Sequence, residues 1–270
     1  MDAWHETLGV VLVAALGVYI GRWISNFRKP YWSVGYVLPF ILIGILLLVR
    51  FFPKIGFQQP FYWIVNGRSR FVILSLVATI GLTAPLSRLK YTFEKIAVFF
   101  AMTLIVFCFG VLPFVVPAFI NKDLSNIQTR MDASGICYQT TPYTCGPAAA
   151  VTALGRLGIS AEEGQIAVLS HSTPVTGTLP GCLSRAINEH YGNLGLKCRY
   201  RHFDSIRELQ EAGNVLVIIK DSLLSDHCVA VLGVEDGFVN VADPVYGKVS
   251  FRREEFEKIW RFCGIVLDRS

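Results

Sequence analysis

Four long apolar runs dominate the first half of the chain, over residues 8–24, 34–52, 71–86 and 96–120. A helix that crosses a membrane needs roughly 20 mostly apolar residues. The second and fourth runs reach this length, and the other two can be extended because Arg22 and Arg70 can snorkel to the head groups. The pattern predicts an all-α transmembrane region of four helices in residues 1–122, with a set of buried core helices as the alternative.

The pattern becomes mixed after a short polar linker over 121–135. Helices are predicted over 147–157, from a capping box at 160–163, over 180–191, over 204–213 with Asp204 as its cap, and over 252–260. Strands are predicted over 196–201, 215–219, 227–234, 238–242 and 264–267. Helices followed by clustered strands indicate an α+β fold. The sequence therefore predicts a second domain over residues 123–270.

Charge divides the chain at the same place. Residues 1–122 hold 11 Lys/Arg and 3 Asp/Glu, a net charge of +8, whereas residues 123–270 hold 14 and 17, a net charge of −3. The basic surplus lies in loops between apolar runs, which argues against a nucleic-acid partner and fits contact with a lipid bilayer. The Lys and Arg residues of the loops divide equally between the two sides of the membrane, six and six, so the orientation rests on the first run. No Lys or Arg precedes that run, which favours an external N-terminus. Four spans would then place residues 123–270 outside as well.

Cys145 is the candidate nucleophile. It directly precedes a predicted helix in which Pro147 suits the first turn and Gly158 suits the end. A thiol at a helix N-terminus faces unpaired N–H groups and the positive end of the helix dipole, and both favour the thiolate. Gln139, six residues upstream, carries an amide that could donate to a developing oxyanion.

His227 and Asp243 are the candidate base and orienting carboxylate. His227 opens a buried strand, Asp236-Gly237 marks a tight turn, and Asp243 closes the returning strand. The start of one hairpin strand lies beside the end of the next, so the two side chains should be neighbours. Asp226 is an alternative carboxylate, but adjacent side chains on a strand point to opposite faces.

These residues resemble family thirty-nine of the cysteine peptidases over about residues 132–268. The matching features are Gln139 six residues before Cys145-Gly146, His227 opening an apolar strand, Asp243-Pro244, Gly177-Thr178, and the Phe256 to Trp260 segment. The resemblance implies a papain-like peptidase domain that removes double-glycine leaders from precursors. It also implies a bacterial inner membrane as the location. The best-known members begin with the peptidase and end with an ATPase, whereas here the membrane half comes first.

The sequence therefore predicts a membrane-anchored thiol protease, a hydrolase that cleaves a peptide or protein precursor. Cys145 would attack, His227 would transfer protons, Asp243 would orient His227, and Gln139 would hold the oxyanion. Two alternatives are another papain-fold acyl-transfer enzyme, an amidase or transpeptidase, and a non-catalytic domain that binds peptide for a transporter.

No cofactor or metal is expected, because the remaining cysteines lack paired ligand spacing. The sequence also lacks a phosphate-binding loop: Gly247-Lys248 is followed by Val249. A separate transporter or ATPase subunit is therefore a candidate partner.

Overall fold

The computed structural model describes residues 3–28, 31–59, 61–62, 68–222 and 225–269. The chain divides into two compact units, residues 1–119 and residues 120–270. This division falls close to the boundary expected from apolar pattern and charge. Each unit is described by itself below.

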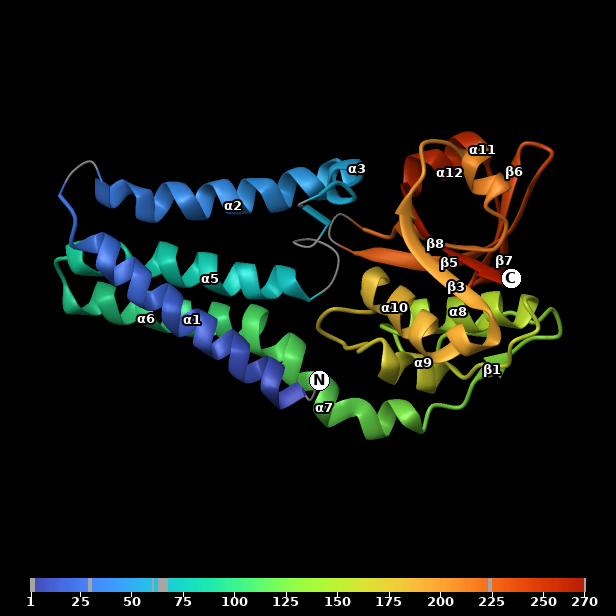
Figure 1. The fold of residues 1–270 in the computed structure, drawn as a ribbon, viewed down its shortest axis with the longest axis horizontal. Helices are drawn as coiled ribbons and strands as arrows, with labels where there is room; N and C mark the ends of the chain where they lie inside the picture. The colour runs from blue at the N-terminus through green and yellow to red at the C-terminus, as the bar shows by residue number, and fades with distance from the viewer. Residues whose placement is uncertain (1–2, 29–30, 60, 63–67, 223–224, 270) are drawn as a thin grey trace. The chain divides into compact units, whose positions relative to one another are not determined.

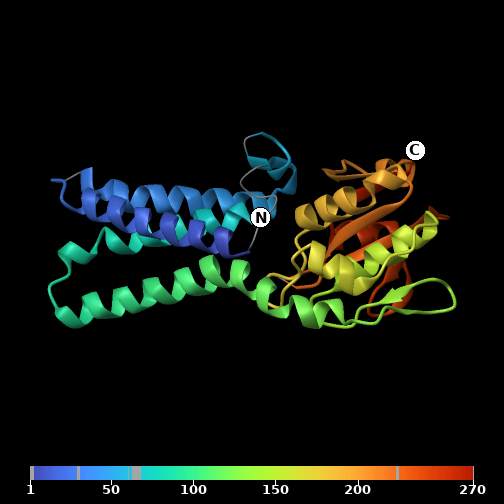
Figure 2. The ribbon, with the colours of Figure 1, turned by 60° about the horizontal axis from the view of Figure 1, so that its bottom comes forward.

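The first unit is helical (Figures 1 and 2). Its long helices are α1 (Ala3–Ser25), α2 (Val34–Phe51), α5 (Ser69–Thr83) and α6 (Thr92–Ile105), and α6 continues through the π-helical segment η3 (Val106–Val111) into α7 (Leu112–Ser125). Short helices are η1 (Tyr31–Ser33), α3 (Pro53–Gly56) and η2 (Leu86–Arg88). Glycine allows α1 to approach α5 closely, because a Cβ on Gly21 would lie 2.9 Å from the Ile80 carbonyl oxygen. Such small-residue contacts are common between membrane helices.

Helices occupy all four predicted apolar runs. Among the described residues, two are long and apolar enough to cross a membrane, Glu6–Ser25 and Thr92–Ser125. Val37–Val49 and Ser69–Thr83 are apolar but shorter. A helix rises about 1.5 Å per residue, so the shorter pair falls below the roughly 30 Å of a bilayer core. That all four cross a membrane stays a prediction.

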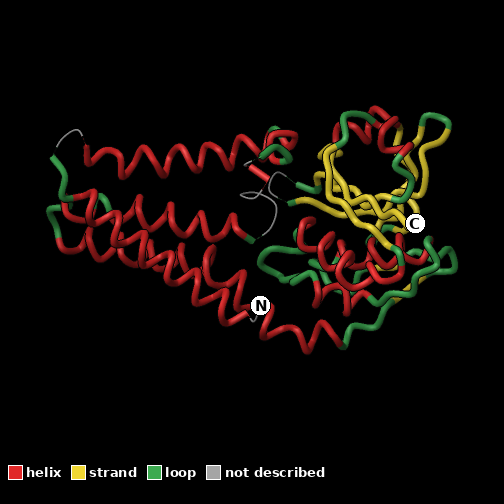
Figure 3. The backbone as a smooth tube through the Cα atoms, viewed as in Figure 1, coloured by secondary structure: helices red, strands yellow, loops and turns green. Residues whose placement is uncertain are grey.

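The second unit has the α+β fold that the sequence predicts. Its helices are α8 (Cys145–Arg156), α9 (Glu163–Leu169), α10 (Pro180–Tyr191), η4 (Gly192–Leu194), α11 (Ile206–Glu211) and α12 (Arg253–Ile259). Its strands are β1 (Arg130–Met131), β2 (Cys137–Tyr138), β3 (Leu196–His202), β4 (Val215–Lys220), β5 (Asp226–Glu235), β6 (Phe238–Asp243), β7 (Gly247–Arg252) and β8 (Trp260–Arg269). Strands β3-β8-β4-β5-β6-β7 form one antiparallel sheet, while β1 pairs with β2. Figure 3 shows the strands, in yellow, gathered in this unit.

Helix α8 is the buried centre of this unit. It packs against β4 and β5, and Ala148, Ala149 and Ala150 are fully buried because their short side chains allow close contact. The helix ends at Arg156, and Gly158, the predicted stop, follows the cap residue Leu157 with a φ of 71° that suits glycine. The N–H groups of Gly158 and Ile159 donate to the carbonyls of Gly155 and Leu154, which completes a Schellman cap.

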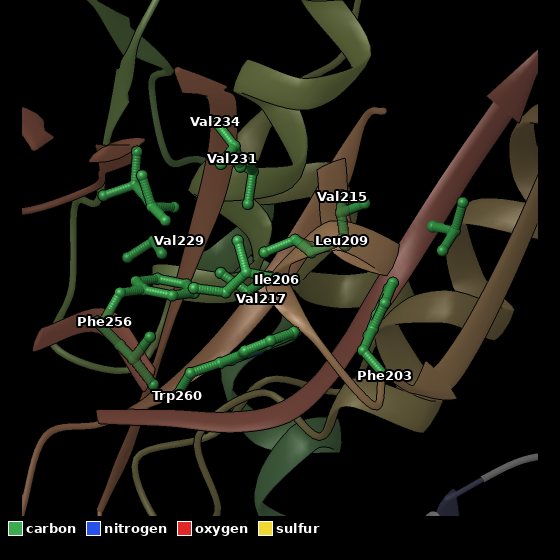
Figure 4. Packing of buried hydrophobic residues seen from close by; sticks show 14 residues of the cluster. Phe203, Ile206, Leu209, Val215, Val217, Val229, Val231, Val234, Phe256 and Trp260 are labelled. Atoms are coloured by element: carbon green, nitrogen blue, oxygen red, sulfur yellow. The ribbon is translucent and has the colours of Figure 1, made fainter. Parts of the chain in front are cut away.

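The other face of the sheet is covered by α11 and α12 (Figure 1). An apolar cluster fills this layer, in which Phe203 and Phe256 flank Trp260 at ring-centroid distances of 5.6 and 5.5 Å (Figure 4). Figure 4 also shows valines of β4 and β5 directed into the same cluster. Packing on both faces fixes the ends of β5 and β6, where the site residues lie.

Three local predictions differ from the structure, and one strand was not predicted. The capping box at 160–163 does not form, because α9 begins at Glu163 and its carboxylate bonds to Thr140. Ser205, rather than Asp204, caps α11 by accepting from the Glu208 N–H. The sequence pattern does not predict strand β7, because its alternating exposed residues carry a weak apolar signal. The predicted polar linker is partly helical, since α7 runs to Ser125 and Leu124 is 1% exposed.

Candidate active site

Cys145 is the first residue of α8 and is partly exposed. Its position therefore combines access with the positive end of a helix dipole. Gly146 allows tight packing here, since a Cβ would lie 3.1 Å from both Thr178 and Leu183. Thr178 in turn donates to the Tyr143 carbonyl at 3.1 Å. Contacts with Thr178 thus hold both the loop before α8, through Tyr143, and the first turn of the helix, through Gly146.

His227 and Asp243 come together as the hairpin pattern predicts. The Asp236-Gly237 turn has positive φ at both residues, and β5 pairs with β6 from Glu235↔Phe238 to Ala230↔Ala242. His227 Nε2 lies 3.0 Å from Asp243 Oδ1. The backbone N–H groups of Val245 and Tyr246 also donate to this oxygen, at 2.7 and 3.3 Å.

The hydrogen bonds of His227 favour a charged imidazole. Burial lowers the pKa of His227, but hydrogen bonds with Asp243 and Cys145, together with their charges, outweigh burial and raise the pKa to about 10. Burial raises the pKa of Asp243, but His227 and the Val245 N–H hold it below its ordinary value. Since Asp243 occupies Nε2, Nδ1 is the ring nitrogen that remains for the thiol.

Gln139 follows β2 and lies beside the residue after Asp243. Its backbone N–H donates to the Pro244 carbonyl at 2.9 Å, and its side-chain Nε2 donates to the Thr141 carbonyl at 3.0 Å. Its Oε1 is buried and has no hydrogen-bond partner among the described residues. An amide nitrogen carries two hydrogens, so one N–H of Gln139 remains for an oxyanion.

A groove with a volume of about 550 Å³ adjoins Gln139. Its lining combines the segment that carries Gln139 with the residues after Asp243, namely Arg130, Tyr138, Gln139, Thr140, Thr141, Pro142, Pro244 and Val245. Arg130 is exposed and brings a positive charge to this lining. The groove is therefore a candidate place for a polypeptide substrate.

The alternative carboxylate, Asp226, and the remaining cysteines have other surroundings than the candidate site. Asp226 forms an ion pair with Arg261 at 2.9 Å, so its carboxylate is engaged away from His227. Burial raises the pKa of Cys137 and of Cys198 to about 12, which disfavours their thiolates at neutral pH. No disulfide joins any of the seven cysteines, all of which lie in the described part of the chain.

The sequence pattern missed the contact between Glu163 and Thr140. The Glu163 carboxylate accepts from the Thr140 N–H at 2.8 Å and from the Thr140 hydroxyl at 2.7 Å. Because 23 positions separate the two residues, no local spacing signals this contact.

A cysteine at the start of a buried helix, beside an antiparallel sheet that carries a histidine–carboxylate pair, defines a papain-like α+β fold. Residues 134–270 match the model of the Peptidase C39 family, and the chain belongs to that family.

Curated relatives include two uncharacterized archaeal proteins. One, from Methanothermobacter marburgensis, is 29% identical over 134 residues, covering 50% of this chain and 88% of the relative. The other, from Methanothermobacter thermautotrophicus, is 26% identical over 143 residues, covering 53% of this chain and 94% of the relative.

Similar solved structures include a double glycine motif protease from an AMS/PCAT transporter in complex with its leader peptide. It is 19% identical, with a TM-score of 0.42, and the match covers 54% of this chain and all of that one. The peptidase domain of Streptococcus ComA, a bi-functional ABC transporter involved in quorum sensing, is also 19% identical, with a TM-score of 0.43. That match covers 49% of this chain and 96% of the domain.

Proposed function

We propose that this chain is a membrane-anchored cysteine peptidase that cleaves a peptide or protein precursor with Cys145, His227, Asp243 and Gln139. The observation that carries the proposal is the pairing of His227 with Asp243, whose Nε2 and Oδ1 atoms lie 3.0 Å apart. Against the effect of burial, Asp243 and the nearby Cys145 raise the pKa of His227 to about 10. A protonated imidazole beside a thiol favours the thiolate–imidazolium pair, which is the reactive form of a cysteine nucleophile.

The reaction follows from this pair. Cys145 Sγ forms a bond to the scissile carbonyl carbon, and the π electrons move to the oxygen, which accepts from the Cys145 backbone N–H and from Gln139 Nε2. As the carbonyl re-forms, the C–N bond breaks and His227 Nδ1 gives its proton to the leaving amine. Water then attacks the acyl carbon, His227 takes a proton from it, and the C–S bond breaks. Asp243 holds the imidazole in the required tautomer throughout.

The substrate proposal rests on the family. Membership of a peptidase family supports a polypeptide substrate, and the groove of about 550 Å³ that Gln139 helps to line is the proposed place for part of that polypeptide. We extend to this chain the double-glycine leader specificity that the resemblance implies. A separate transporter would be the partner that carries the precursor across the membrane to the peptidase domain.

The membrane proposal rests on an inverted distribution of polar and apolar side chains in the first unit. Phe40, Phe93 and Phe100 are 71%, 79% and 67% exposed. Ser75 and Thr79 are each 1% exposed, and they donate to the backbone carbonyls of Phe71 and Ser75. Water would disfavour such large apolar surfaces, whereas lipid accepts them. We therefore place residues 1–122 in the cell membrane, with residues 123–270 as the peptidase domain on the outer side.

The test compares wild-type protein with Cys145→Ala on a synthetic precursor that carries a Gly-Gly leader. Mass spectrometry should show two fragments with wild type and none with the variant, while circular dichroism shows both folded. Product analysis with an added amine nucleophile separates hydrolysis from transpeptidation, because water and the amine compete for the same acyl-enzyme. A peptidase yields mainly the free acid, whereas a transpeptidase yields mainly the amide. Cleavage by Cys145→Ala at a rate near wild type would refute the assigned nucleophile.

A further inference from the structure

Glu163 is a buried carboxylate whose side chain bonds outside its own helix. It is 0% exposed, although it is the first residue of α9. Burying a carboxylate is costly unless it is hydrogen-bonded, so its partners show what it holds in place. Both of its side-chain bonds go to one residue, Thr140, through the backbone N–H at 2.8 Å and the hydroxyl at 2.7 Å.

Thr140 lies between Gln139 and Thr141 in the chain. The carbonyl of Thr141 accepts a hydrogen bond from Gln139 Nε2 and so sets the direction of the Gln139 amide. Thr141 is held in addition by its N–H to the Thr144 hydroxyl at 3.1 Å, one residue before the nucleophile. The Glu163 carboxylate therefore holds the middle of a short segment whose two ends orient the amide.

Glu163 is itself held in place by its backbone. Its N–H donates to the Thr129 hydroxyl at 2.9 Å. The next residue, Gly164, packs so closely that a Cβ would lie 2.3 Å from the Leu124 carbonyl oxygen. The carboxylate is thus presented from a fixed support rather than from a mobile loop.

We propose that Glu163 is a positioning residue for the oxyanion donor Gln139. This inference rests on the proposed function, because it assigns Glu163 a role only if Gln139 stabilises an oxyanion. Glu163 does not touch the reacting atoms. It fixes Thr140, and through Thr140 it fixes the direction of the free Gln139 N–H.

Two small reagents separate this role from a general structural one. p-Nitrophenyl acetate acylates a thiolate through a tetrahedral oxyanion: the C–S bond forms, and the C–O bond to p-nitrophenolate then breaks. Iodoacetamide alkylates the same thiolate by displacing iodide, and its carbonyl carbon is not attacked. A displaced Gln139 therefore slows acylation of Cys145 and leaves its alkylation unchanged. Both reactions are measured on the full-length chain in detergent, with the signal of Cys145→Ala subtracted for the other thiols.

Glu163→Ala should slow acylation about 10–100-fold, somewhat less than loss of a whole oxyanion donor. Its alkylation rate should stay at the wild-type value. Glu163→Gln retains an acceptor for Thr140 and should show a smaller loss of the same kind, as should Thr140→Val, which keeps the backbone bond. The matched control is Glu162→Ala, because Glu162 is exposed and should leave both rates unchanged.

A double variant tests whether Glu163 acts through Gln139. In Gln139→Ala, which lacks the donor, a further Glu163→Ala change should slow acylation little, since residues that act as a unit are not additive. Fully additive losses, equal losses in acylation and alkylation, or no loss of acylation would overturn the proposal. If Glu163→Ala does not fold, the same comparison is made with Glu163→Gln and Thr140→Val. An acylation signal that persists in Cys145→Ala would instead overturn the nucleophile, and Glu163 with it.

Discussion

The bond between His227 and Asp243 predicts how the pH profile changes when the carboxylate is neutralised. Asp243→Asn keeps an oxygen that can accept from Nε2–H but removes the negative charge 3.0 Å from it. A hydrogen bond to a charged group contributes about 1.5–3 kcal/mol, and one pKa unit is about 1.36 kcal/mol. The loss should therefore lower the His227 pKa by about 1–2 units from its value of about 10.

The direction of the shift in the pH profile follows from the protonation state of His227. The imidazolium form donates the proton to the leaving group, it is present below its pKa, and it is lost as pH rises through that pKa. The alkaline limb of kcat/KM should thus move to lower pH in Asp243→Asn. Asp243→Ala should react more slowly still, because the His227 imidazole also loses the group that orients it. His227→Ala should lose more than either, because it removes the proton donor itself.

The assay combines pH profiles on a Gly-Gly precursor peptide with nuclear magnetic resonance of labelled histidine, in which His227→Ala identifies the signal. The measured values belong to the coupled Cys145–His227 pair rather than to one residue. If the alkaline limb and the His227 titration are both unmoved in Asp243→Asn, another group orients the base and the reasoning fails.

Three further predictions concern the first unit and its junction with the second. Full-length protein should stay with membranes after carbonate extraction because of its exposed apolar helices; recovery in the soluble fraction without detergent would contradict this. A fragment from Ile120 onward should fold and keep Cys145 reactive toward iodoacetamide, since this unit has its own core; a folded but unreactive fragment would show that the first unit helps to build the site. Gly164→Ala should lower the free energy of unfolding by about 1–3 kcal/mol through its clash with Leu124. The control, Gly155→Ala, has no atom within 4 Å of its added Cβ, and equal thermal stability of the two variants would contradict the packing argument.

The sequence was most informative where chemistry depends on neighbouring strands. A two-residue turn fixes which hairpin residues face each other, so Asp236-Gly237 was enough to predict that His227 and Asp243 meet. Helix α8 was predictable for a similar reason, because its stop at Gly158 is a local property. Contacts between distant segments were beyond this reasoning. A glutamate three residues after a serine satisfies the capping-box pattern. Only the packed fold shows that the Glu163 carboxylate instead accepts hydrogen bonds from Thr140.

The direction of Gln139 was also beyond sequence reasoning. Its spacing of six residues before Cys145 placed it near the nucleophile, but its amide direction depends on the carbonyl of Thr141. Edge strand β7 escaped prediction because an exposed edge needs few apolar residues. Strand β7 is held in its extended form by pairing with β6, from Phe238↔Arg252 to Asp243↔Gly247, rather than by a pattern in its own residues.

The burial of Leu124, in the last turn of α7, has a consequence for building chimeras. Leu124 is 1% exposed and its carbonyl touches Gly164, while Thr129 bonds to the backbone of Glu163. These residues belong to the peptidase core although they look like a connecting segment. A graft onto a foreign anchor should therefore join at or before Ile120, and a flexible spacer inserted between Leu124 and Thr129 would not act as a neutral tether. It would separate two contacts that support Glu163, the residue proposed to position Gln139.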